Sequence, residues 1–467
     1  MQVPAKVRVR EVRLYRRFAA YRFPFHVAGV SITGGNEVFA RVRVEDGQGR
    51  SAWGAAAESP APTWFDKTRP ADIVWPDIVR VLAASASLYP SLGGEAPARL
   101  WQAADAALRA CFATVPGSIV SLGSALVDRA VLDASCRIDG LSLFEAIRAD
   151  RMGLAHAAPA DLAGFDLGRW LASRPASPAG GIAARHTIGG ADALVRADIE
   201  RPLDDGLPES LDEVVAAYGC RYFKIKIGSD ATAAVDRLAR IASVLDARVP
   251  DWRATLDGNE QWSDPDAALA LLRRLRAARP DIAARVLYLE QPIVRGIDGP
   301  LGELGRAIPC ILDEGDGAPE AFVQAHAAGW RGVSAKTCKG IYRALLNAAR
   351  CEAWADGSML TGEDLNHLPG LSLQQDLAMA KVLELPHTER NGHHYAAGFD
   401  HAPAAEAQAF CAAHPDLYVN DGRRVRVAIT GGRIATGSLD GPGFASSAQP
   451  DWEGGTSPPL TPLEAAS

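Results

Sequence analysis

The chain has 467 residues, of which 48% are hydrophobic and 22% are charged, and its formal net charge is −7. This length and globular composition predict two domains, or a barrel with additions. The negative charge gives no electrostatic basis for binding nucleic acid or an anionic membrane surface, and no apolar run is long enough to predict a membrane span. Seven dispersed cysteines and the lack of a signal-peptide core predict a cytoplasmic protein with reduced thiols.

The N-terminal part, residues 1–155, has the pattern of a small sheet followed by helices. Apolar alternation predicts strands over residues 7–14 and 38–44, the second ended by a turn at 45–47. Helical patterns follow at residues 72–86, 97–113, 127–134 and 143–148. We therefore expect residues 1–155 to form an α+β domain.

From about Gly181, short apolar runs alternate with stretches of helical composition. Eight runs are strand candidates, each followed by connecting sequence. They are residues 182–186, 222–227, 252–256, 286–289, 308–312, 332–335, 359–360 and 382–385. Eight consecutive βα units predict a closed (β/α)₈ barrel of the α/β class over residues 180–415.

The C-terminal part changes character again. Residues 416–445 predict a short β extension with hairpin turns at 420–422 and 430–432, and we expect it to pack back on the N-terminal domain. Residues 446–467 are rich in Ser, Pro, Gly and Ala and predict a disordered tail.

Three carboxylates end three consecutive predicted strands, the third to the fifth. They are Asp257, Glu290 and Asp313. The carboxyl ends of barrel strands face one shared mouth, so these side chains are expected to converge. Hard oxygen ligands suit Mg²⁺, with Mn²⁺ as a substitute, whereas the lack of soft ligands disfavours zinc and copper.

Lysines are placed on both sides of this trio. Lys226 lies on the second predicted strand and Lys336 follows the sixth, half a turn away around the barrel. A cation stabilises the charge that develops when a proton leaves the carbon beside a carboxylate, and a lysine can accept that proton. Lys224 shares a face with Lys226 at roughly 6–7 Å. We expect its like charge to lower the pKa of Lys226, and its ammonium to contact a carboxylate.

The ordered set of motifs resembles the enolase superfamily, in particular its muconate lactonizing enzyme subgroup. The motifs are Lys224-Ile225-Lys226, Asp257, Glu290, Asp313-Glu314 and Lys336, and the resemblance covers most of the chain. It implies a capping domain over a modified barrel, the three carboxylates as metal ligands, and Lys226 and Lys336 as the bases. A mandelate racemase-type site would instead use a late-barrel histidine.

The resemblance also implies that loops of the capping domain close over the mouth and select the substrate. Phe25-His26 and Glu58-Ser59-Pro60 are the candidates for this role. The late-barrel segments 362–367 and 389–395 match no subgroup of known substrate, so the resemblance leaves the substrate open.

Several further polar residues are candidates for supporting roles. Glu363 is expected to hydrogen-bond Lys336 or the substrate, and His186 either reaches the mouth or is a buried structural histidine. Arg390, with His393 and His394, either binds a distal carboxylate or lies in a surface loop. The remaining supporting candidates are Asn259, Glu314 and Lys339.

These expectations describe an enzyme that abstracts the α-proton of a small carboxylate substrate, giving an epimer, a lactone or a dehydrated acid. We expect a homo-oligomer without nucleic-acid or membrane partners. One alternative is a metal-independent barrel enzyme that uses a lysine Schiff base or a glycosidase-type carboxylate pair. The other is a catalytically inactive binding protein on the same scaffold.

Overall fold

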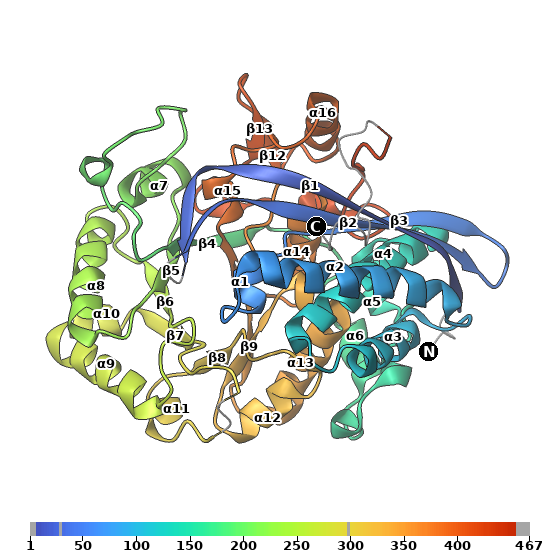
Figure 1. Cartoon of the computed structure of the whole chain (residues 1–467), viewed down its shortest axis with the longest axis horizontal. Coiled ribbons are helices and arrows are strands. Elements are labelled where there is room, and N and C mark those ends of the chain that lie inside the picture. Colours follow the sequence, from blue (N-terminus) through green and yellow to red (C-terminus); the bar gives the residue numbers. More distant parts are fainter. Residues whose placement is uncertain (1–5, 28–29, 297–298, 454–467) are drawn as a thin grey trace.

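A computed structural model describes residues 6–27, 30–296 and 299–453 of the chain (Figure 1). An antiparallel sheet with helices forms the N-terminal capping domain, and a closed parallel barrel follows it. The α/β fold class predicted from the sequence, a (β/α)₈ barrel with an N-terminal α+β domain, is therefore confirmed.

The capping domain contains one sheet of order β1-β2-β3 with helices packed against it. Strands β1 and β2 are much longer than predicted, and their outer part crosses the molecule as a two-stranded arm toward the barrel (Figure 1). The strands are β1 (Val7–Val27), β2 (Val30–Asp46) and β3 (Ser51–Glu58); the helices are α1 (Pro62–Phe65), α2 (Ala71–Leu88), α3 (Pro97–Cys111), α4 (Gly117–Asp139), α5 (Leu143–Arg148) and α6 (Leu167–Ala172).

All four helices predicted in this region are confirmed, but α4 is almost three times as long as its predicted core. The run at 127–134 is only its middle, because the preceding turns are rich in serine and glycine, which carry no apolar pattern. Gly123 is buried against Val81, where an added side chain would collide. The helix ends at Gly140, whose left-handed backbone (φ 68°) is the usual helix stop.

The barrel strands run in sequence order from β4 to β11, and β11 pairs with β4 to close it. The strands are β4 (Ile182–Ile188), β5 (Tyr222–Lys226), β6 (Arg253–Asp257), β7 (Val286–Glu290), β8 (Cys310–Leu312), β9 (Gly332–Ala335), β10 (Met359–Gly362) and β11 (His387–Arg390). The connecting helices are α7 (Leu211–Tyr218), α8 (Ala231–Asp246), α9 (Pro265–Ala278), α10 (Pro280–Ala283), α11 (Glu303–Ala307), α12 (Ala321–Ala327), α13 (Ile341–Trp354), α14 (Leu371–Val382) and α15 (Gly392–Tyr395).

The predicted eighth strand, residues 382–385, is wrong. That apolar run finishes α14 and continues into a turn in which Glu384 has a positive φ of 56°. The true eighth strand is the polar sequence His387–Arg390, and all four of its residues are buried. This polar strand can be buried because its side chains find hydrogen-bond partners inside the molecule. His387 bonds Arg185, Glu389 bonds Thr187 and Arg390 bonds Asp376.

The C-terminal part contains α16 (Ala404–Ala413), β12 (Tyr418–Asn420), β13 (Val425–Val427) and β14 (Arg433–Ile434). The hairpin predicted around residues 420–422 is confirmed by the pairing of β12 with β13. The expectation that residues 416–445 pack on the capping domain is wrong for β14. This strand pairs with the first residues of β4 in the barrel.

After β14 the chain contacts the capping domain again. The Phe444 amide donates to the Asp133 carboxylate at 2.6 Å, and the Trp452 ring lies against Tyr15 and Phe39. Residues 446–453 were predicted as part of a disordered tail, but their apolar and backbone contacts fix them here. Residues 454–467 lie outside the described residues.

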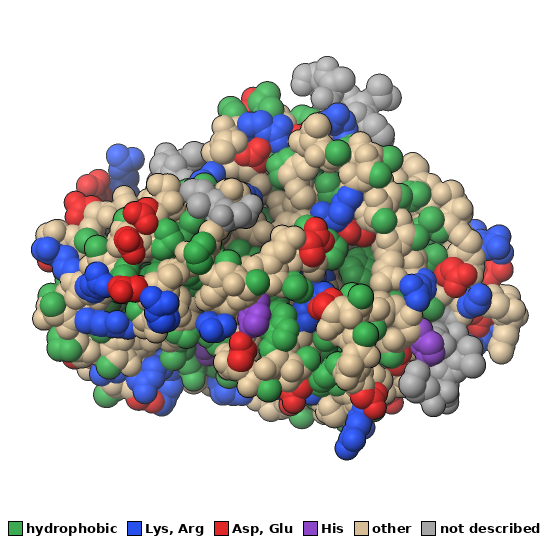
Figure 2. Space-filling view, turned by 90° about the horizontal axis from the view of Figure 1, so that it is seen from below, with side chains coloured by type: hydrophobic (Ala, Val, Ile, Leu, Met, Phe, Trp, Pro, Cys, Tyr) green, Lys and Arg blue, Asp and Glu red, His purple; other side chains and the backbone are tan. Residues whose placement is uncertain are grey.

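Basic and acidic side chains are interspersed over the face of the molecule shown in Figure 2. Over the described residues, no patch of a single charge sign gathers on this face. None of the helices in the described part combines the length and hydrophobicity needed to cross a bilayer. All seven cysteines are free, and four of them are buried.

Candidate active site

A cavity of about 90 Å³ lies at the carboxyl ends of the barrel strands, below the capping domain. Its walls combine residues from both domains. The capping domain contributes Phe25, Ala61, Thr63, Trp64 and Lys67, and the barrel contributes Thr187, Lys224, Lys226, Asn259, Glu260, Asp313, Glu314, Lys336, Asp364, Leu365, Asn366, Glu389 and Asn391. The predicted lysines thus line the same cavity as Asp313 and Glu314.

Lys226 and Lys336 enter this cavity from opposite parts of the barrel. Lys226 ends β5, whereas Lys336 follows β9, four strands further around the closed sheet. Each amine has its own carboxylate partner: Lys226 Nζ donates to Asp257 at 2.6 Å, and Lys336 Nζ donates to Asp313 at 2.7 Å. The cavity therefore has one lysine–aspartate pair on each side.

Lys224 lies deeper, at the centre of four carboxylates. Its ammonium nitrogen is 2.8 Å from Glu290, 2.7 Å from Glu363, 3.0 Å from Asp257 and 3.1 Å from Glu389. Burial disfavours its charge, but these carboxylates outweigh that effect and raise the pKa of Lys224 well above its usual value.

This arrangement changes the expected role of Lys224. Its positive charge is compensated on four sides, so like-charge repulsion cannot be its main effect on Lys226. The pKa of Lys336 is also raised: burial opposes the charge, but Asp313 more than compensates. In this arrangement Lys336 is an ammonium, which is a proton donor.

Asp313 is held by donors from three elements. Lys339 Nζ donates to its side chain at 3.2 Å and to its backbone carbonyl at 2.8 Å, and the Ser334 hydroxyl also donates to the carboxylate. Burial alone would raise the pKa of Asp313, but the charges of Lys336 and Lys339 lower it well below its usual range. Lys339 thus supports a carboxylate rather than contacting the cavity.

Asp257, Glu290 and Asp313 have the donor chemistry of a Mg²⁺ site. All three are at most 1% exposed, and the pairing of β6 with β7 places Asp257 beside Glu290 on one face of the sheet. Glu290 Oε2 is buried and has no hydrogen-bond partner among the described residues. Burial and the neighbouring charges of Asp257 and Glu363 raise the pKa of Glu290 well above its usual value, and the contact with Lys224 only partly offsets them.

The three carboxylates are not gathered around one point. Within residues 6–27, 30–296 and 299–453, no three His, Cys, Asp or Glu side chains form a group that could hold a metal ion as they stand. Lys224 bridges Asp257 and Glu290, while Asp313 is engaged by Lys336 and Lys339. The donor set fits a hard dication, and the ammonium groups occupy the oxygens that such an ion would bind.

Asn259 and Glu314 form one wall of the cavity beside these carboxylates. The Asn259 backbone amide donates to Asp257 at 2.8 Å, and its side-chain amide donates to Glu314 at 3.1 Å. Burial, followed by the charges of Asp313 and Asp257, raises the pKa of Glu314 to about 7. Glu314 Oε2 has no hydrogen-bond partner in the described part of the chain.

Glu363 does not bond Lys336, which was one of the two contacts predicted for it. It is fully buried below the cavity, where its carboxylate accepts from Lys224, Arg185 and the Thr361 hydroxyl. Sequence analysis missed Arg185 and Glu389, the other members of this network. Arg185 was assigned only as a strand residue, and Glu389 was placed in a segment that was not recognised as the eighth strand.

His186 and Arg390 lie outside the cavity. They pair with each other across β4 and β11, on the face opposite Arg185 and Glu389. His186 packs against the rings of His393 and His394, and burial lowers its pKa to about 4. Arg390 bonds Asp376 of α14. Strand alternation turns both side chains away from the mouth, so neither has the predicted substrate-binding role.

The capping residues predicted to select substrate are divided in the structure. Phe25 lines the cavity, but the side chain of His26 lies outside the described residues. Glu58 is fully buried and bonds His367 of the barrel and Arg129 of α4, so it joins the domains and does not face the cavity. Ser59 and Pro60 line a neighbouring cavity.

Trp64 of α1 is a cavity residue that the sequence analysis missed. Its indole N–H donates to Asp313 at 3.1 Å, and its ring lies 4.3 Å from the Lys336 ammonium. Arg295, from the loop after β7, donates to the backbone carbonyls of Trp64 and Phe65 and to Glu260. A pair of aromatics shortly after a proline was the local sequence signal for this contact.

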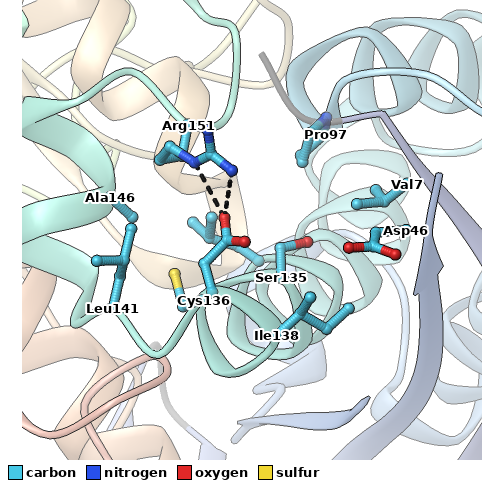
Figure 3. A pocket seen from close by; sticks show the side chains of 11 residues that line it. Val7, Asp46, Pro97, Ser135, Cys136, Ile138, Leu141, Ala146 and Arg151 are labelled. Carbon is cyan, nitrogen blue, oxygen red and sulfur yellow. Dashed lines mark hydrogen bonds and ion pairs between the residues drawn. The ribbon is translucent and has the colours of Figure 1, made fainter. Parts of the chain in front are cut away.

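A second hollow in the capping domain is too small to be a site. It holds about 10 Å³, roughly the space of one water molecule, and lies between β1, α3 and α4. On one side of it Arg151, which Figure 3 labels, donates to Asp139 at 2.6 Å. The candidate site is the cavity at the barrel mouth, because it is there that the predicted lysines and carboxylates meet.

The fold and this cavity define a capped barrel protein with a mouth lined by lysines and carboxylates, and comparisons with known proteins agree. Residues 206–421 match the family described as enolase C-terminal domain-like. The matched residues, which make up most of the barrel, are therefore an enolase C-terminal domain-like domain. No curated protein matches the sequence.

Solved structures with the same fold span nearly the whole chain. An enolase from Bradyrhizobium complexed with magnesium and mandelic acid has a TM-score of 0.60 and 17% identity, covering 96% of this chain and 97% of its own. A mandelate racemase/muconate lactonizing enzyme from Roseovarius nubinhibens has a TM-score of 0.56 and 17% identity, with coverages of 97% and 98%. A dipeptide epimerase from Enterococcus faecalis complexed with Mg and the dipeptide L-Leu-L-Tyr has a TM-score of 0.56 and 14% identity, with coverages of 83% and 90%.

Proposed function

We propose that this protein is a Mg²⁺-dependent enzyme that moves a proton at the carbon next to a substrate carboxylate. The observation that carries the proposal is the placement of Lys226 and Lys336 in one cavity, from β5 and from the end of β9. Two amines that approach from opposite sides can serve the two faces of a single carbon atom.

The lysines have complementary tasks in this reaction. One lysine must be neutral to accept the α-proton, while the other can be an ammonium that donates a proton to the opposite face. The Lys336 ammonium, covered by the Trp64 ring, is suited to the donor task. Proton return to the opposite face gives an epimer, and loss of a β-leaving group or ring closure gives a lyase or cycloisomerase product.

Asp257, Glu290 and Asp313 are the residues that would hold Mg²⁺. Support comes from their oxygen-only donor set, the unpartnered Glu290 oxygen, and the magnesium complexes of the Bradyrhizobium and Enterococcus proteins. A bound Mg²⁺ would stabilise negative charge on the substrate carboxylate, which lowers the barrier to losing the neighbouring proton. The chain's own groups would position the acid and exclude water, chiefly through the cover that α1 provides.

Deuterium exchange in D₂O tests the proposal directly. Carboxylic acids are incubated with the enzyme and Mg²⁺, and deuterium at the α-carbon is measured by NMR. Lys226→Met and Lys336→Met keep the side-chain length but remove the amine. We expect each to lose about 10²–10⁴-fold of the exchange on one face, and the double variant to lose both.

The control is Lys6→Met, which makes the same change at an exposed lysine of the capping domain. Melting temperatures of all variants separate a chemical loss from a folding defect. Exchange at the wild-type rate in both Lys226→Met and Lys336→Met would rule out these bases. Full exchange in EDTA would rule out the metal and favour the Schiff-base or carboxylate-pair alternative.

A further inference from the structure

Another cavity adjoins the cavity at the barrel mouth, on the side of the capping arm. We call the cavity at the barrel mouth the catalytic cavity. The adjoining cavity has a volume of about 50 Å³, and four residues line both cavities: Phe25, Ala61, Leu365 and Asn366. By this measure a single water needs about 10–15 Å³, so the adjoining cavity has room for several non-hydrogen atoms. We call this adjoining cavity the annex.

The two cavities differ in chemistry. Four lysines and five carboxylates line the catalytic cavity. Among the described residues, no Asp, Glu, Lys, Arg or His side chain lines the annex. Its walls are mainly apolar, with Ala19 and Ile32 from the capping arm, Pro60 from the following loop and Leu368 from the barrel.

The polar groups of the annex are few and neutral. The Ser59 side chain is 8% exposed, and its hydroxyl has no hydrogen-bond partner among the described residues. Tyr21, Asn36 and Asn366 also carry neutral polar groups there. A charged group would meet no opposite charge in the annex, and a polyhydroxylated group would exchange its hydrogen bonds to water for these few partners. An apolar group would lose few hydrogen bonds to water on entering the annex. It could carry one acceptor for the Ser59 hydroxyl.

We propose that the annex binds an uncharged, predominantly apolar substituent of the substrate acid. The inference rests on the proposed function, because the substrate carboxylate then lies among the lysines of the catalytic cavity and its substituent passes Phe25 and Ala61. The substrate class is an acid with an alkyl or aryl side chain. Sugar acids and dicarboxylic acids do not fit this division of the site.

The test measures affinity and proton exchange separately, so that the annex and the proposed function can fail independently. The probes are 2-hydroxy acids and N-acetyl amino acids whose side chain grows from methyl to butyl. Counterparts carry the same chain ended by a hydroxyl or a carboxylate. Dissociation constants are measured by calorimetry with Mg²⁺, and exchange by NMR in D₂O. We expect affinity to rise about fourfold per methylene in at least one series, with the polar counterparts at least tenfold weaker.

Two variants alter the annex in opposite directions. Ala19→Leu fills it and should flatten the dependence on chain length, reducing the ratio of butyl to methyl affinity at least tenfold. Ile32→Ala enlarges it and should move the preference to longer chains, which keeps the test valid if Ala19→Leu fails to fold. The control is Ala233→Leu on the exposed surface of α8, which should keep the wild-type dependence.

The outcomes separate the two ideas. Affinity that rises with chain length, but without deuterium incorporation, supports the annex and counts against the proposed function. Deuterium incorporation that is greatest for hydroxylated or dicarboxylic acids, and is unaffected by both variants, overturns the annex and leaves the proposed function standing. Absence of binding by every acid in both series overturns both.

Discussion

Lys224 shows how one residue can organise a whole cluster of buried charges. Its ammonium contacts four carboxylates that come from four different strands. Isolated buried carboxylates would be strongly disfavoured, and a central ammonium makes their common burial possible. Removing one carboxylate charge from this cluster should therefore change the stability of the protein differently from removing one charge of an ordinary ion pair.

Glu290→Gln tests this distinction. We expect the variant to bind Mg²⁺ at least about tenfold more weakly, because it lacks one charged oxygen ligand. In EDTA its melting temperature should be equal to or above the wild-type value, because burial and the charges of Asp257 and Glu363 disfavour the anion more than its contact with Lys224 favours it. Calorimetric titration with MgCl₂ and thermal unfolding in EDTA measure the two effects.

Glu384→Gln is the matched control, since it makes the same change at a glutamate whose side chain is 56% exposed. It should change neither Mg²⁺ affinity nor melting temperature by more than a small amount. A Glu290→Gln variant with unchanged Mg²⁺ affinity and a lower melting temperature in EDTA would contradict the assignment of Glu290 as a ligand.

At the scale of elements, the short helix α1 depends on barrel residues for its position. A four-residue helix has little stability of its own. Arg295 donates to the carbonyls of Trp64 and Phe65 at its end, at 3.0 and 2.9 Å, and Glu260 fixes the same guanidinium at 2.8 Å. This contact holds the Trp64 ring against Lys336 and its indole N–H against Asp313.

Arg295→Ala should therefore impair catalysis without touching the cavity itself. Each lost hydrogen bond to a charged group contributes about 1.5–3 kcal/mol, so α1 should detach from the barrel for part of the time. We expect the exchange rate to fall at least tenfold and proteolysis within residues 59–66 to become faster. Limited proteolysis followed by mass spectrometry gives a measurement that is independent of activity.

Arg295→Lys is the conservative comparison, because a lysine keeps the charge but cannot reach both carbonyls and Glu260 as a planar guanidinium does. It should be intermediate in both measurements. Wild-type proteolysis and wild-type exchange in Arg295→Ala would show that α1 holds its place without this contact.

Strands with an apolar outer face could be predicted from the sequence, and the polar eighth strand could not. Phe223 and Ile225 of β5 are buried among helices, so a local apolar pattern marks that strand. In His387–Arg390 every side chain is polar, and its burial depends on partners up to 202 residues away in sequence, such as Arg185. No local pattern contains that information.

The same distinction applies to the site. Asp257, Glu290, Asp313 and Lys336 could be found because each comes directly after, or ends, an apolar strand. Trp64 could not be found in this way, since the contact between α1 and the barrel is set by how two domains pack. The alternation of faces, had it been applied to β4, would have turned His186 outward and Arg185 inward.

At the scale of the whole molecule, the capping domain is fixed to the barrel by contacts from both ends of the chain. The arm of β1 and β2 lies across the barrel (Figure 1). Arg17 of β1 donates to Glu406 of α16 at 2.8 Å. The segment after β14 returns to the capping domain through Phe444 and Trp452. A cavity built from both domains needs this fixed relation.

The most buried of these links is the contact of Glu58 with His367 and Arg129. Its carboxylate accepts from His367 at 2.6 Å and from Arg129 at 3.1 Å, and all three side chains are at most 2% exposed. Burial alone would raise the pKa of Glu58, but the charges of His367 and Arg129 lower it to about 2. Burial would lower the pKa of His367, but Glu58 raises it above its usual 6.5.

These shifts predict a bell-shaped pH dependence for the link. The Glu58 contribution is present above its unfolded pKa of 4.5 and is lost as the pH falls toward 2. The His367 contribution is present below 6.5 and is lost as the pH rises through its raised pKa. Both are therefore present between about pH 4.5 and 6.5.

Glu58→Gln should destabilise the protein most within that window, on the order of 3 kcal/mol from the Glu58 shift. The difference in unfolding free energy from wild type should shrink toward pH 3 and above the raised pKa of His367. Urea unfolding at half-unit steps of pH measures it, with Glu352→Gln at an exposed helix position as the control. A difference that stays constant from pH 3 to 8 would mean that Glu58 joins the two domains by packing alone, and not by its charge.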